Sequence, residues 1–146
     1  MNRQLQLVAE MEQRKEDKLA ADYGQAQQDL AEQSERLDIL QTHKKDYIDN
    51  VLAEGKQGVV SQQMMRFQSF ISQLDKACSQ QQNKVHTANK VVEQRRALWL
   101  NQQRKRKAIE ALLDKQKQQA IAFEQKQEQK MFDEFAIQQF VRRKLA

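Results

Sequence analysis

The sequence predicts an all-α fold in which two long helices form an antiparallel coiled-coil hairpin, with the second helix longer and overhanging the first. Only 39% of the 146 residues are hydrophobic, 31% are charged and the mean hydropathy is −0.93, so a deep globular core is hard to supply. The chain has no Pro and only three Gly, which favours helices over disorder. Both halves also carry a repeat of apolar residues with a period of about 3.5 residues, which indicates a coiled coil.

The first helix is predicted over about residues 3–54 as one arm of the hairpin. Alternating steps of four and three residues trace its seam. The seam residues are Leu19, Tyr23, Ala26, Leu30, Gln33, Leu37, Leu40, Lys44, Tyr47 and Val51. The stretch AEGKQGVVS then predicts a turn at 55–60, because Gly55 is suited to end a helix and Ser61 to begin one.

The second helix is predicted over about residues 61–140. Its seam residues are Phe67, Ile71, Leu74, Cys78, Gln81, Val85, Ala88, Val92, Arg95, Trp99, Gln102, Arg106, Ile109 and Leu113. If the chain folds back near residue 57, the numbers of facing residues sum to about 114, and Gln33 then faces Gln81 while Leu40 faces Leu74. A parallel coil between two chains would not require this match. We therefore predict a single hairpin domain over residues 1–146, and leave a dimer of hairpins open.

Polar residues interrupt the seam near the two termini. These residues are Glu12, Glu16, Gln102 and Arg106. Because an unpaired buried charge is costly, we expect these layers to splay or to let their side chains reach water, with contacts such as Glu16 to Arg95 or Lys18.

The second arm is too long for the first to cover. Met1 pairs near residue 113, so roughly 30 residues, or about 45 Å of helix, should overhang. The tail KMFDEFAIQQFVRRKLA is rich in apolar residues. Its candidate anchors for a partner protein are Met131, Phe132, Phe135 and Phe140. Self-association of the overhang, or packing back on the first arm, is the structural alternative.

A second apolar surface is predicted near the turn. Phe70 lies beside the seam with Leu74 and Ala77, and this widens the apolar stripe beyond what two helices bury. Leu40 and Tyr47 extend the stripe on the other arm. Arg36 and His43 flank it. The alternative to a docking surface is a locally wide core that Tyr47 and Phe70 cover.

Other classes of function find little support. The net charge of +5 is interspersed with acidic residues, and the RKRK run at 104–107 lacks aromatic neighbours, so we expect a solvated face and no nucleic-acid partner. His43 and His86 are far out of register, and Cys78 fits a small apolar filler, so neither a metal nor another cofactor is expected. A two-helix rod offers no concavity for catalysis, and we predict that the chain is not an enzyme.

The lack of a long apolar run predicts a cytoplasmic protein with no direct membrane insertion. A single Cys also fits a reducing compartment.

Two segments resemble a known family. YIDNVLAEGKQGVVSQQMMRFQSFISQLDKA around the turn and QKMFDEFAIQQFVRRK near the end are similar to the FliJ family, small coiled-coil components of the bacterial flagellar type III export apparatus. The resemblance implies an antiparallel coiled coil similar to the central stalk of rotary ATP synthases. It also implies binding inside the ring of the export ATPase FliI and promotion of its assembly, contact with the export gate protein FlhA, and recycling of export chaperones.

The resemblance further implies two assignments of residues. The family's gate-binding surface falls on Arg36, Leu40, His43, Tyr47, Phe70, Leu74, Ala77 and Gln81, where His43 and Gln81 replace the family's tyrosine and histidine. By analogy with the rotary stalk, the end that carries both termini enters the ATPase ring, which assigns the tail to FliI. A peripheral location at the cytoplasmic face of the inner membrane follows. The equivalent stalk of a virulence injectisome, and a basic nucleic-acid-binding coil, are the alternatives.

Overall fold

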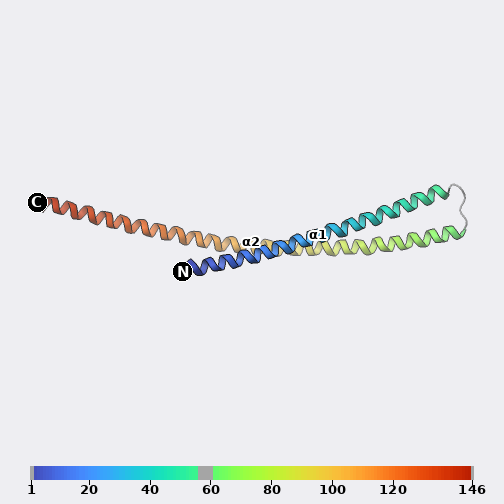
Figure 1. The fold of residues 1–146 in the computed structure, drawn as a ribbon, viewed down its shortest axis with the longest axis horizontal. Helices are drawn as coiled ribbons and strands as arrows, with labels where there is room; N and C mark the ends of the chain where they lie inside the picture. The colour runs from blue at the N-terminus through green and yellow to red at the C-terminus, as the bar shows by residue number, and fades with distance from the viewer. Residues whose placement is uncertain (1, 56–60, 146) are drawn as a thin grey trace. The chain divides into compact units, whose positions relative to one another are not determined.

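Two unequal helices make up the described part of the protein. The structure, a computed structural model, describes residues 2–55 and 61–145. Helix α1 spans Asn2–Gly55 and helix α2 spans Ser61–Leu145, 54 and 85 residues long (Figure 1). The helices run antiparallel and pack against each other, and the described ranges contain no strand. The predicted all-α hairpin with a longer second helix is confirmed.

The ends of the helices follow from local chemistry. Helix α1 ends at Gly55, a residue type that favours helix C-termini, and α2 begins at Ser61. The rest of the predicted turn, residues 56–60, lies outside the described residues. The last turn of α2 holds Arg142, Arg143 and Lys144, whose positive charges interact favourably with the carbonyl end of the helix dipole.

The chain forms two compact units. The terminal unit combines the start of α1, through Glu16, with α2 from Gln102 onward, and the tip unit spans Asp17–Asn101. Each helix contributes to both units. A single domain over residues 1–146 stays a prediction.

In the tip unit the heptad seam lies where the sequence places it. Ala26, Gln81, Ala88 and Val92 are buried, and the other seam residues of this unit are half-buried. The side-chain amide of Gln81 donates to Gln33 Oε1 at 2.8 Å and to the Gln33 carbonyl oxygen at 2.9 Å. The predicted Gln33–Gln81 layer is thus present, and it fixes the register of the two helices.

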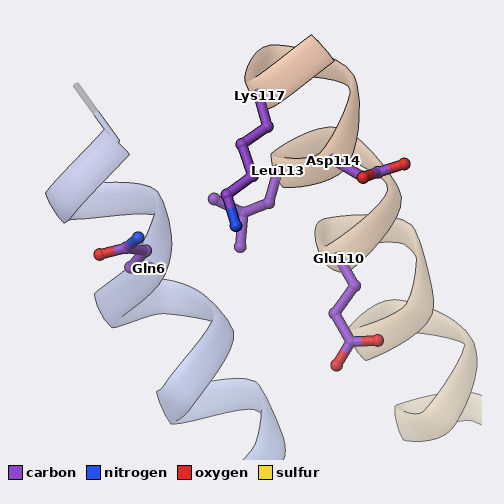
Figure 2. Close-up of a pocket in the computed structure, with 5 residues that line it drawn as sticks. All are labelled: Gln6, Glu110, Leu113, Asp114 and Lys117. Atoms are coloured by element: carbon purple, nitrogen blue, oxygen red, sulfur yellow. The ribbon is translucent and has the colours of Figure 1, made fainter. Parts of the chain in front are cut away.

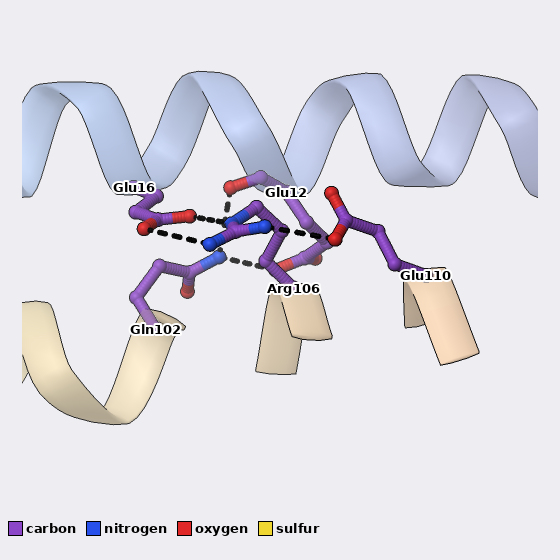
Figure 3. Close-up of polar contacts among 5 residues, drawn as sticks. All are labelled: Glu12, Glu16, Gln102, Arg106 and Glu110. Atoms are coloured by element: carbon purple, nitrogen blue, oxygen red, sulfur yellow. Dashed lines mark hydrogen bonds and ion pairs between the residues drawn. The ribbon is translucent and has the colours of Figure 1, made fainter. Parts of the chain in front are cut away.

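In the terminal unit the polar layers are closed, which corrects the expectation that they splay. Gln102 is 7% exposed and donates to the Glu12 carbonyl oxygen at 3.1 Å and to the Glu12 carboxylate. Glu16 is 6% exposed and forms its ion pair with Arg106 (Figure 3). Arg95, which the sequence suggested for Glu16, lies 3.7 Å from Asp22 in the tip unit. The layers close because long side chains from both helices satisfy one another inside the seam.

Candidate binding surfaces

An aromatic cluster organises the surface near the end of the tip unit. The Tyr47 ring stacks on Phe67 at a centroid distance of 5.6 Å and meets Phe70 at 4.5 Å with a tilt of 57°. Phe67 and Tyr47 are half-buried, whereas Phe70 remains 42% exposed. Tyr47 therefore covers the seam, as the alternative of a locally wide core predicts. Phe70, which also contacts the Tyr47 ring, remains partly exposed to solvent.

A shallow hollow of about 360 Å³ lies beside this cluster. It is lined by Leu40, His43, Asp46, Tyr47, Asn50, Phe70 and Leu74. Five of the residues that the sequence suggested for the gate contact are thus brought together around one hollow. Asp46 and Asn50 were not predicted from the sequence, although they lie three and seven residues after His43 and therefore on the same face of α1.

The other three suggested residues stand apart from the hollow's lining. Arg36 is exposed on α1 and Ala77 is half-buried on α2. Gln81 is 7% exposed, and its amide is committed to Gln33. The position of Gln81 is that of a residue that holds the two helices in register.

A second hollow in the tip unit is lined by different residues. It measures about 330 Å³ and is formed by Gln41, Lys44, Lys45, Ile48, Asp49 and Cys78. Lys44 pairs with Asp75, and this hydrogen bond raises the pKa of Lys44 above its ordinary value of 10.5. Cys78 is half-buried, as expected for a small apolar filler of the seam.

Most of the overhang of α2 is exposed. Gln116 is the last half-buried residue, and every residue from 118 to 145 is exposed. The four anchors suggested by the sequence are among the most exposed: Met131 70%, Phe132 74%, Phe135 60% and Phe140 60%. Lys144 lies over the Phe140 ring at 5.1 Å.

The polar cluster of the terminal unit is shown in Figure 3. The Arg106 guanidinium contacts both Glu16 and Glu110, the latter at 2.9 Å, and these bonds raise the pKa of Arg106 above its ordinary value. The hydrogen bond from Gln102, together with the nearby Lys15, lowers the pKa of Glu12 below 4.5. Arg106 of the RKRK run is therefore turned into the seam, and only Arg104, Lys105 and Lys107 face solvent.

A third hollow lies where the two helices of the terminal unit run side by side. It measures about 220 Å³ and is lined by Gln6, Glu110, Leu113, Asp114 and Lys117 (Figure 2). Across residues 2–55 and 61–145 no group of three or more His, Cys, Asp or Glu is placed to hold a metal ion. Neither described helix is long and apolar enough to cross a membrane.

The family model described as "Flagellar FliJ protein" matches residues 1–145. The chain belongs to the FliJ family. Two relatives carry the same description: the Flagellar FliJ protein of Salmonella typhi, 24% identical with 90% of each chain covered, and that of Escherichia coli K12, 25% identical with 77% covered. No solved structure matches significantly. Membership of the FliJ family makes this chain a component of flagellar protein export.

Proposed function

We propose that this FliJ-family chain is a non-enzymatic, stalk-like adaptor of flagellar export. In this proposal it binds the export ATPase FliI and promotes assembly of its ring, contacts the gate protein FlhA and helps recycle export chaperones at the cytoplasmic face of the inner membrane. The observation that carries the proposal is the presence of two apolar surfaces in different units: the exposed overhang in one and the aromatic hollow in the other.

The distribution of apolar residues on the overhang supports insertion into a socket. The exposed apolar residues of its last part are Met131, Phe132, Phe135, Ile137, Phe140, Val141 and Leu145. At 100° per residue they point to all sides of the helix. A helix that docks in a groove presents one apolar stripe, whereas apolar side chains on every side can all be covered only where protein surrounds the helix. The interior of an ATPase ring is such a surrounding.

The hollow of the tip unit supports a different kind of contact. Phe70 and Leu74 lie on one of its walls, and Leu40 and Tyr47 on the other, with His43 and Asp46 as polar neighbours. A partly exposed aromatic ring beside a hollow is typical of an anchor point for a partner protein. We assign this surface to the export gate, with Gln81 in a supporting role.

Two variants separate the two surfaces. Truncation after Leu113 removes the overhang, and we expect it to abolish stimulation of the purified ATPase while gate binding is retained. The pair Phe70→Ala and Leu74→Ala should do the reverse. The matched control is Ile39→Ala with Leu52→Ala, because these side chains are 50% and 63% exposed and do not line the hollow.

Circular dichroism melts should accompany both assays. If truncation and the Phe70/Leu74 pair weaken both partners to the same extent, the assignment of separate surfaces is wrong. If the control pair weakens gate binding as much as the Phe70/Leu74 pair does, the hollow is not the contact.

A further inference from the structure

The two flanks of the terminal unit differ in chemistry. On one side, the seam is bordered by Gln6 of α1 and by Glu110, Asp114 and Lys117 of α2, which form the hollow of Figure 2. This polar flank is acidic overall.

The opposite side, here called the basic flank, carries apolar and cationic residues. Its members are Val8, Met11 and Lys15 of α1 and Lys105, Leu112 and Lys115 of α2. Val8, Met11 and Leu112 are 40%, 55% and 50% exposed, and the three lysines are exposed. Helical spacing places each set on one side of its helix.

Glu12 shows that the two helices present these sets on the same side. Lys15 donates to Glu12 Oε1 at 3.3 Å, and the charge of Lys105 also lowers the pKa of Glu12. The positive charges of Lys15 and Lys105, one from each helix, therefore both act on the Glu12 carboxylate. Lys115 follows on the same side of α2, so the flank has more positive than negative charge.

The overhang contains a segment of opposite character. Residues 124–135 hold four acidic side chains against two lysines, which leaves two net negative charges. Glu124 and Glu128 lie on the same side of α2 as Phe132 and Phe135, which are 74% and 60% exposed. This acidic and apolar segment matches the basic and apolar flank in both charge and hydrophobicity.

The overhang cannot reach the flank of its own molecule. Helix α2 is continuous from Ser61 to Leu145 and contains no Pro or Gly, so the segment extends along the helix axis away from Lys115 and has no bend by which to return. Contact between the two surfaces requires a second molecule. A two-fold dimer would make the contact twice.

We propose that, in the free protein, the acidic overhang of one copy docks on the basic flank of a second copy. The dimer covers Val8, Met11 and Leu112 together with Phe132 and Phe135. Insofar as the proposed function is right, it also withholds the overhang from the ATPase ring until the dimer dissociates. The self-association itself is independent of that function and is measured with no other protein present.

Sedimentation velocity of the full chain over a wide concentration range tests the proposal. We expect a monomer–dimer equilibrium that shifts to monomer at high salt, because exposed charges are screened. The pair Lys105→Glu and Lys115→Glu should raise the dimer dissociation constant by at least about tenfold, since each reversal acts twice in a two-fold dimer.

The control pair is Lys107→Glu with Lys117→Glu, which makes the same change of charge away from the basic flank and should leave the equilibrium unchanged. Glu124→Lys with Glu128→Lys, added to the Lys105/Lys115 pair, should restore dimerisation. Circular dichroism confirms that each variant folds. A protein that stays monomeric at all concentrations, or a dimer that responds to both lysine pairs alike or to neither, would overturn the proposal.

Discussion

The Gln33–Gln81 layer offers a direct test of how the hairpin sets its register. Gln81 is 7% exposed and donates two hydrogen bonds to Gln33, at 2.8 Å and 2.9 Å. In Gln81→Ala both bonds are lost, and Gln33 Oε1 loses the donor that it has in the partly buried layer, while Gln33 Nε2 still donates to Asp29 at 3.4 Å. At roughly 1 kcal/mol for each bond, we expect the free energy of unfolding to fall by about 2 kcal/mol.

Urea unfolding followed by circular dichroism measures this change. With a slope of about 2 kcal/mol per molar urea, the midpoint should fall by about 1 M. The exposed neighbour provides the control, since Gln82→Ala removes the same atoms outside the seam and should shift the midpoint little. Equal shifts for Gln81→Ala and Gln82→Ala would refute the register role of this layer.

The double variant Gln33→Leu and Gln81→Leu sharpens the same test. Replacing both polar partners by apolar side chains leaves no buried polar side-chain group unsatisfied and adds apolar contact. The free energy of unfolding should therefore be equal to or greater than that of the parent chain. The loss should appear in specificity, because an all-apolar layer no longer selects one alignment. Sedimentation should then show additional oligomers. A unique species with the parent's mass would show that the rest of the seam determines the alignment.

Two further predictions concern α1. The hydrogen bond from Gln102 lowers the pKa of Glu12 in the folded chain, so this carboxylate contributes stability that is present above about pH 4.5 and is lost as pH falls through the lowered pKa. The melting temperature of Glu12→Gln should therefore depend less on pH in that window than the melting temperature of the parent chain. Parallel curves of melting temperature against pH would contradict this. Gly24 lies inside α1 and a Cβ there meets no atom within 4 Å, so Gly24→Ala should raise the free energy of unfolding by about 1 kcal/mol in the same urea assay, and a decrease would reveal a contact that the structure lacks.

The heptad pattern was sufficient to predict the fold, because a coiled coil is determined by the spacing of apolar residues along each helix. Summing facing positions even placed Gln33 opposite Gln81. The same rule was less informative for long polar side chains. Arg106 pairs with Glu16, which lies about one heptad away from the α1 position that the facing rule places opposite Arg106. The partner of a flexible cation depends on how far its side chain extends, and the heptad pattern does not give this distance.

The candidate surfaces divide in a similar way. Exposure of the overhang followed from counting residues, since α1 is too short to cover α2. The hollow beside Phe70 required the structure, because Asp46 and Asn50 join it through positions on the surface of α1 that carry no apolar signal. The heptad seam correctly placed Gln81 opposite Gln33, and its burial separates it from the exposed residues that the resemblance assigned to the gate surface.

The placement of aromatic residues argues that partners complete this molecule. Of the six Phe in the chain, Phe70, Phe123, Phe132, Phe135 and Phe140 are between 42% and 74% exposed, while the buried apolar residues among those that the structure describes are Ala26, Ala88 and Val92. The seam does hold stacked aromatic pairs, Tyr23 with Trp99 and Tyr47 with Phe67, but most of the Phe side chains lie outside it. Substituting the exposed Phe should therefore cost binding far more than stability. The hairpin holds its register by its seam, and five of its six Phe remain exposed at the surface for other proteins.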